Sequence, residues 1–134
     1  MSDLQLTTSR AGKVDVVTAH GSMTAQHAMM LHSRLELLLR RPAAVIVLDL
    51  AAVTACDITA VTVLRAAAAV AVNSGCGLRL ARPPGPVAGI LRTAHTLRFI
   101  PAYASLDAAI HARINELLDT LHVPAPRESP PAGA

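Results

Sequence analysis

The sequence predicts one α/β domain with a mostly parallel sheet of about five strands and about four helices. Strand-like and helix-like segments alternate along most of the chain, which is typical of sheets built through helical crossovers. The segment VIVLDL is a continuous apolar run, as expected for a strand buried on both faces. The chain has 134 residues, 52% hydrophobic and 16% charged, a composition that suits one packed core and excludes a disordered chain.

The first part of the chain shows two strand patterns and one helix pattern. Residues 4–9 alternate weakly and predict an edge strand, and residues 14–20 predict a second strand that ends at Gly21. Over residues 24–40 the apolar period becomes helical, and Pro42 is expected to end this helix. The apolar face of the helix consists of Ala28, Leu31, Leu35 and Leu38.

The middle of the chain repeats the strand-then-helix order. Residues 45–50 predict the buried strand, residues 51–57 a loop, and residues 58–74 a helix. Gly75 follows this helix at a position where a left-handed residue commonly ends a helix. The predicted apolar side of the helix consists of Val61, Leu64, Ala68 and Val72.

Two more strands are predicted, over residues 78–81 and 99–102. Between them, residues 83–86 read as a rigid loop, and Pro86 is well placed in the first turn of a short helix that reaches about Ala94.

A final helix is predicted to begin after Ser105, which can cap it. Its apolar stripe consists of Leu106, Ile110, Ile114, Leu117 and Leu121. The remaining segment, PAPRESPPAGA, cannot bury apolar surface. We therefore expect a domain over residues 1–122 and a Pro-rich disordered tail over residues 123–134.

The composition argues against a nucleic-acid partner. The chain has one Tyr, one Phe and no Trp, so it lacks the aromatic platforms on which single strands stack. The net charge is +3, and the basic residues are scattered along the chain rather than clustered.

We expect a cytoplasmic protein without a membrane partner, for two reasons. The N-terminus lacks the layout of a signal peptide, and charged residues interrupt every apolar run before it reaches the roughly 18 residues of a membrane span. Cys56 and Cys76 have the spacing of neither a redox pair nor a zinc site, and we interpret them as small buried hydrophobic residues in a reducing compartment.

Motifs for catalysis are missing from the sequence. It contains no Gly-rich phosphate loop and no GxSxG nucleophile motif. The six histidines show no paired metal-ligand spacing, and Asp49, Asp57 and Asp107 are widely separated. We therefore expect a non-enzymatic domain that holds no cofactor and no metal.

The segment VTACDITAVTVL, residues 53–64, places an acid and a hydroxyl at the start of a helix. Asp57 precedes the helical pattern, where its carboxylate can accept hydrogen bonds from free backbone N–H groups. Two interpretations remain open. Asp57 caps the helix and Thr59 is a bystander, or Thr59 is a phosphorylation site, where a phosphate adds about −1.5 to −2 charges that a helix N-terminus accommodates.

The longer segment VIVLDLAAVTACDITAVTVL resembles the central signature of STAS domains of the anti-sigma factor antagonist type. In that family a strand ending Leu-Asp-Leu leads to Asp-Ser-Ser-Gly at a helix start, so Asp57 matches the Asp and Thr59 matches the second Ser, the phospho-acceptor. GCGLRLA resembles the next strand, and VAGILRTAHTLRFIPAYASLDAAI resembles the closing segment. The resemblance runs over about residues 4–121 and implies the STAS fold.

The signature departs from the family pattern at several positions. Ile58 replaces the first Ser, Ala60 replaces the Gly, and the acceptor is a threonine. Where family members often carry Gly-Glu-Leu-Asp after the second strand, this chain has Gly-Ser-Met-Thr from Gly21 on. Threonine is phosphorylated in related scaffold-type STAS proteins, so Thr59 keeps the required chemistry.

The resemblance implies a partner-switching regulator that acts as a monomer or homodimer. Unphosphorylated, it would bind an anti-sigma factor with a serine/threonine kinase-like fold and free a sigma factor. Phosphorylation of Thr59 would end binding, and a phosphatase would restore it. The implied contact surface combines residues 51–57, the exposed side of helix 58–74 and parts of residues 83–94. The candidate partner-binding residues are Asp57, Ile58, Thr59, Ala60, Thr62 and Arg65.

Two other roles remain open. The chain could be a STAS scaffold subunit of a large stress-sensing assembly, which the mass of its complexes would reveal. It could also be a STAS module that binds a small ligand or a transporter, and ligand-dependent thermal shifts would test for a small ligand.

Overall fold

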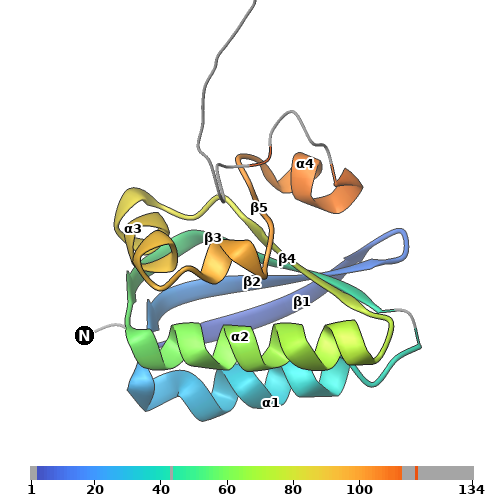
Figure 1. Ribbon diagram of the computed structural model, residues 1–134, viewed down its shortest axis with the longest axis horizontal. Coiled ribbons are helices and arrows are strands. Elements are labelled where there is room, and N and C mark those ends of the chain that lie inside the picture. The colour runs from blue at the N-terminus through green and yellow to red at the C-terminus, as the bar shows by residue number, and fades with distance from the viewer. Residues whose placement is uncertain (1–2, 43, 113–116, 118–134) are drawn as a thin grey trace, which may run out of the picture.

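A computed structural model, which describes residues 3–42, 44–112 and 117, confirms the α/β class. In this part of the chain, four α-helices pack around a five-stranded sheet (Figure 1). The strands are β1 Gln5–Ala11, β2 Val14–Met23, β3 Val45–Cys56, β4 Gly77–Ala81 and β5 Ala102–Tyr103. The helices are α1 Ala28–Leu38, α2 Ile58–Asn73, α3 Gly85–Thr93 and α4 Leu106–His111, with short 3₁₀ helices η1 Ala25–His27 and η2 Thr96–Arg98.

The strands lie in the sheet in the order in which they occur in the chain. β1 pairs with β2 in antiparallel orientation and lies at one edge, as predicted, and every later neighbouring pair is parallel. Parallel neighbours need a crossover segment between them, and α1, α2 and α3 lie in those connections.

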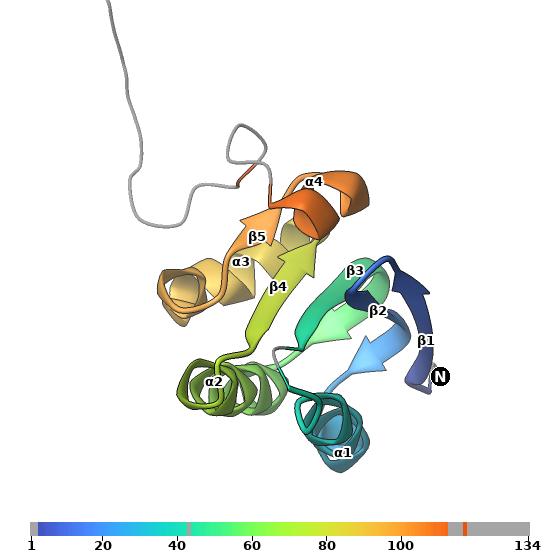
Figure 2. The same ribbon diagram turned by 90° about the vertical axis from the view of Figure 1, so that its right-hand side faces the viewer.

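The helices form layers on both faces of the sheet. Figure 2 shows α1 and α2 side by side along one face and α4 on the other. Successive residues of β3 point to opposite faces, so Ile46 and Leu48 join the main core under α1 and α2. Val47 instead packs with Ala81, Tyr103 and the alanines of α4. The prediction of a strand buried on both faces is therefore confirmed.

The predicted apolar face of α1 is confirmed, because all four of its residues are buried. In α2, Val61, Leu64 and Ala68 are buried as predicted, but Val72 is 75% exposed. The buried stripe also runs through Ala60, Ala67 and Ala71. The buried face of α2 is therefore centred on these alanines and the three correctly predicted residues, and Val72 lies outside it.

Strands β2 and β3 are longer than the sequence predicts. β2 continues past Gly21 to Met23, and β3 continues to Cys56, because the two extensions pair with each other in parallel register. Gly21 has φ +99° and lies at a register shift, so it bends the strand instead of ending it. The prediction of a loop over residues 51–57 is therefore wrong for most of its length.

The end of the described chain also differs from the prediction. Residues 96–98 form η2, Phe99 is exposed, and the last strand occupies Ala102–Tyr103 instead of residues 99–102. Ser105 caps α4 as predicted, through a hydrogen bond from Ala108 N to Ser105 Oγ.

α4 is shorter than the predicted final helix. It ends at His111, where Ala112 adopts a left-handed conformation, and Leu117 forms a bridge with Tyr103 instead of continuing a helix. Ile114, Leu121 and the predicted tail 123–134 lie outside the described residues.

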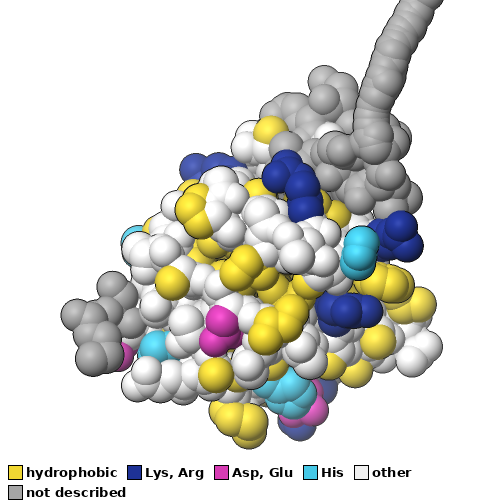
Figure 3. Space-filling model, turned by 60° about the vertical axis from the view of Figure 1, so that its left-hand side comes forward, with side chains coloured by type: hydrophobic (Ala, Val, Ile, Leu, Met, Phe, Trp, Pro, Cys, Tyr) yellow, Lys and Arg dark blue, Asp and Glu magenta, His cyan; other side chains and the backbone are white. Residues whose placement is uncertain are grey.

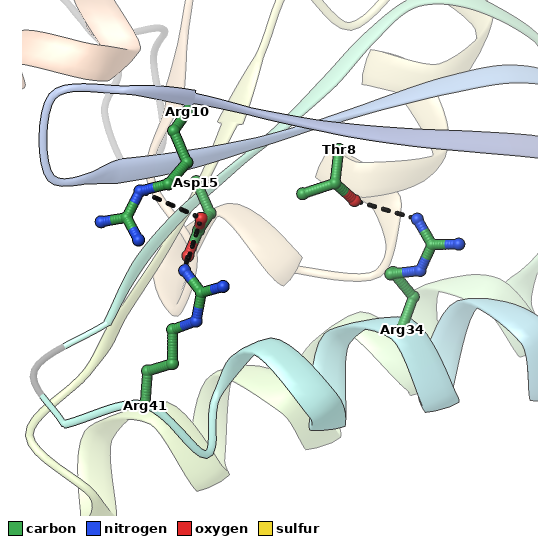
Figure 4. A network of polar contacts seen from close by, with 5 residues as sticks. All are labelled: Thr8, Arg10, Asp15, Arg34 and Arg41. Carbon is green, nitrogen blue, oxygen red and sulfur yellow. Dashed lines mark hydrogen bonds and ion pairs between the residues drawn. The ribbon is translucent and has the colours of Figure 1, made fainter.

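Arginines of α1 and its C-terminal turn bind the helix to the antiparallel hairpin (Figure 4). Arg41 donates to both carboxylate oxygens of the buried Asp15, at 3.0 and 3.2 Å, and Arg10 lies 3.7 Å from the same carboxylate. Arg34 donates to Thr8 Oγ1 at 2.9 Å. Within the described ranges, none of the helices is both long and apolar enough for a membrane crossing.

Candidate functional site

Asp57 lies between the end of β3 and the start of α2, and its carboxylate binds the beginnings of two helical segments. Oδ1 accepts a hydrogen bond from Ala60 N at 3.0 Å, which confirms the predicted cap of α2. Oδ2 accepts from Ala25 N at 2.8 Å, in the first residue of η1, which leads into α1. This second bond was not predicted, because Ala25 is distant in the sequence.

Thr59 is the second residue of α2 and is exposed to solvent. In the part of the chain that the structure describes, no hydrogen bond engages its hydroxyl. Thr62, one turn further on, differs because its Oγ1 donates to Ile58 O at 2.9 Å. Thr59 therefore presents an uncommitted hydroxyl beside the backbone N–H groups that open α2.

The neighbouring residues of this turn point in two directions. Ile58 is 62% exposed and lies at the start of α2. The side chain of Ala60 is fully buried, so only its backbone takes part in the site, through the bond to Asp57. The structure thus places Ile58, Thr59, Thr62 and Arg65 on the surface and Ala60 in the core.

Arg65 and Phe99 meet on the outer side of α2. The guanidinium carbon of Arg65 lies 5.0 Å from the centroid of the Phe99 ring, a cation–π contact. Beside this pair is an open groove of about 480 Å³, lined by Thr62, Arg65, Ala66, Ala68, Ala69, Val72 and Phe99. The sequence did not indicate Phe99 for this site, because it was assigned to a strand.

A second hollow, of about 500 Å³, separates the start of α2 from α3. It is lined by Ile58, Pro86, Gly89, Ile90, Thr93 and Ala94. Figure 3 shows the end of the molecule where α3 and the start of α2 lie, with exposed apolar side chains in yellow, an acidic side chain in magenta among them, and basic side chains in dark blue towards the top and right. The structure therefore brings Ile58 together with residues of the predicted 83–94 segment.

Cys56 adjoins the site but has a weakly reactive thiol. Burial, and to a smaller extent the negative charge of Asp57, together raise the pKa of Cys56 to about 11. The thiolate is the nucleophilic form, so the side chain is protonated and inert at neutral pH. Both Cys56 and Cys76 are partly buried and unpaired. Among the described residues, no group of three His, Cys, Asp or Glu side chains is placed to hold a metal ion.

Solved structures of other proteins share this architecture. A candidate anti-sigma factor antagonist from Thermotoga maritima is 16% identical, with a TM-score of 0.73 over 80% of this chain and 92% of that one. An anti-sigma factor antagonist from Mycobacterium paratuberculosis is 21% identical, with a TM-score of 0.68 over 82% and 93%. Unphosphorylated SpoIIAA, an anti-sigma factor antagonist, is 10% identical, with a TM-score of 0.63 over 84% and 98%. The chain thus has the fold of these antagonists.

The chain belongs to the STAS domain family. The family model described as "Mlab, STAS domain" matches residues 6–98, which include β2, β3, α2 and α3. A comparison with curated protein sequences finds no match. The family and fold expected from the Asp57–Thr59 signature are therefore confirmed.

Proposed function

We propose that this protein is a non-enzymatic anti-sigma factor antagonist, switched off by phosphorylation of Thr59. It binds an anti-sigma factor with a serine/threonine kinase-like fold and thereby frees a sigma factor. A phosphatase reverses the modification. The observation that carries the proposal is the exposed, uncommitted hydroxyl of Thr59 in the first turn of α2. The shared fold of three solved structures of antagonists or candidate antagonists supports the class of partner.

The surroundings of Thr59 suit a switch that leaves the fold intact. A phosphate on this residue would lie near the N–H groups at the start of α2, where the helix dipole favours negative charge. The same phosphate would stand next to the exposed Ile58 and its apolar hollow. A partner that covers Ile58 would have to desolvate the phosphate, so binding would weaken while the domain stays folded.

Phosphosite mapping of the protein purified from its own host tests the switch. We expect a mass gain of one phosphate located at Thr59. A Thr59→Ala chain should lack this phosphate, and a Thr62→Ala chain should keep it. The absence of phosphate at Thr59 under both growth and stress conditions would contradict the switch.

Copurification with the host's kinase-like anti-sigma factors tests the partner. The proposal expects a stable complex with one of them, formed by a monomer or dimer of this chain. Recovery of the chain only in a much larger assembly would instead favour the scaffold role.

A further inference from the structure

The basic residues of this protein are distributed unevenly with respect to its acids. No Asp or Glu occurs between Asp57 and Asp107, an interval that contains α2, β4, α3, η2 and β5. The same interval contains five arginines: Arg65, Arg79, Arg82, Arg92 and Arg98. The surface formed by these elements therefore lacks its own carboxylates.

Two of these five arginines have partners inside the domain. Arg82 forms a two-pronged ion pair with the buried Asp49, and this hydrogen bond and charge raise the pKa of Arg82. Arg79 donates to the carbonyl oxygens of Ala109 and Ile110, at 2.9 and 3.1 Å. The guanidinium groups of these two residues are therefore engaged in contacts within the domain.

The other three arginines, Arg65, Arg92 and Arg98, are exposed on α2, α3 and η2. Within residues 3–42, 44–112 and 117, no carboxylate lies within ion-pair distance of any of them. We call the exposed parts of α2, α3 and η2, together with Phe99 at the end of η2, the arginine face. Arg10 and Arg41, which lie outside this face, differ because both contact Asp15.

The arginine face also carries exposed apolar side chains. Phe99 is 57% exposed, Val72 is 75% exposed, and both line the groove beside Arg65. The Phe99 ring supports the guanidinium of Arg65 from one side, and such stacking leaves the in-plane N–H groups available to a carboxylate. Aromatic residues and arginines of this kind dominate the binding energy of protein interfaces.

We propose that the arginine face binds an acidic protein surface, on which carboxylates meet Arg65 and its neighbours and an apolar side chain enters the groove at Phe99. The inference rests on the proposed function and adds the chemistry of the anti-sigma factor's contact surface. Charge complementarity carries it, because residues 58–106 contain no acid and the salt bridges of the described residues involve none of the three arginines. Of the three, Arg65 lines the apolar groove itself. An anionic membrane is the alternative occupant, and the second experiment below distinguishes it from an acidic protein surface.

Calorimetric titration of the full chain with the copurified anti-sigma factor tests the inference. We expect Arg65→Glu to weaken binding about tenfold or more, and Phe99→Ala to weaken it as well. Arg40→Glu is the matched control, because Arg40 is exposed in the turn after α1, outside the elements of the arginine face, and the charge change is identical. Its effect should stay within about twofold. Equal affinity of the Arg65→Glu and Arg40→Glu chains would overturn the inference and leave the proposed function standing.

A second experiment tests the inference even if no anti-sigma factor binds to this chain. Two synthetic amphipathic helical peptides with identical leucine positions, one with glutamate and one with lysine on the polar face, are titrated into the ¹⁵N-labelled chain. The glutamate peptide should shift the amide signals of α2 and η2, and Arg65→Glu should abolish these shifts. Equal shifts with the lysine peptide would overturn the inference. So would binding to phosphatidylglycerol vesicles without binding to the glutamate peptide.

Discussion

The carboxylate of Asp57 accepts a hydrogen bond from the backbone N–H of Ala25, which lies 32 residues earlier in the sequence. The other oxygen of the same carboxylate caps α2 at Ala60. One side chain therefore fixes the start of α2 against the start of the segment that leads into α1. Because Thr59 lies within this turn, the position of its hydroxyl depends on the same carboxylate.

Asp57→Ala should destabilise the domain by about 2 kcal/mol, because the substitution removes an N-cap and leaves a second backbone N–H without its acceptor. Urea unfolding followed by circular dichroism measures this loss. Asp57→Asn is the matched control. Its single amide oxygen can retain one of the two bonds, so about half of the loss is expected. Equal stability of the Ala and wild-type chains would contradict the bridging role.

Thr59→Asp should leave the domain folded and more stable than Thr59→Asn by about 0.5 kcal/mol, because only the aspartate adds negative charge at the start of α2. The two side chains have nearly the same shape, so the pair isolates the charge. Under the proposed function, the Asp chain should also bind the anti-sigma factor more weakly than the Asn chain. Calorimetry checks the binding, and identical affinities would argue against charge at Thr59 as the switch.

Cys56 should make stability fall at alkaline pH. The pKa of its thiol is about 11 in the folded chain and 9.0 ordinarily, so the folded state disfavours the thiolate. The stability that this group contributes is therefore complete below pH 9 and is lost as the pH rises towards about 11. Urea unfolding at a series of pH values, compared with Cys56→Ala, measures the difference between the two chains. A difference that does not change between pH 8 and pH 11 would contradict the prediction.

Gly75→Ala should destabilise the domain by about 1 kcal/mol, because Gly75 has φ +71° and an alanine is strained in this left-handed region. This conformation lets Cys76 N donate to Ala71 O at 2.7 Å and close the end of α2. Gly77→Ala is the matched control, since neither position has an atom within 4 Å of an added Cβ and Gly77 lacks the positive φ. Thermal unfolding should separate the two variants, and equal losses would exclude backbone strain as the cause.

Much of the candidate site follows from local sequence. The cap at Asp57 and the position of Thr59 in the first turn of α2 depend on residues within one helical turn of each other. Local chemistry also ends α2, where Gly75 follows the cap residue Ser74, and places Pro86 in the first turn of α3. These features could be predicted because their partners are neighbours in the chain.

Other parts of the site arise from contacts between distant segments. β3 extends to Cys56 only because β2 continues beside it past Gly21. Phe99 belongs to the arginine face because η2 replaces the predicted start of the last strand and brings the ring to Arg65. In both segments the apolar pattern of the sequence fits the predicted structure as well as the observed one. The pattern therefore could not distinguish between them.

Sequence patterns alone predict the α/β class, the order of the elements and the signature Asp57-Ile58-Thr59 at the start of a helix. Apolar periodicity and helix capping involve residues that are close in the sequence, so both can be recognised from the sequence alone. Three relationships require the folded structure: Asp57 also binds Ala25, Val72 is exposed, and Arg65 stacks on Phe99. These relationships depend on how two helices and a sheet pack against each other, because packing sets which distant backbone groups and side chains come within bonding distance.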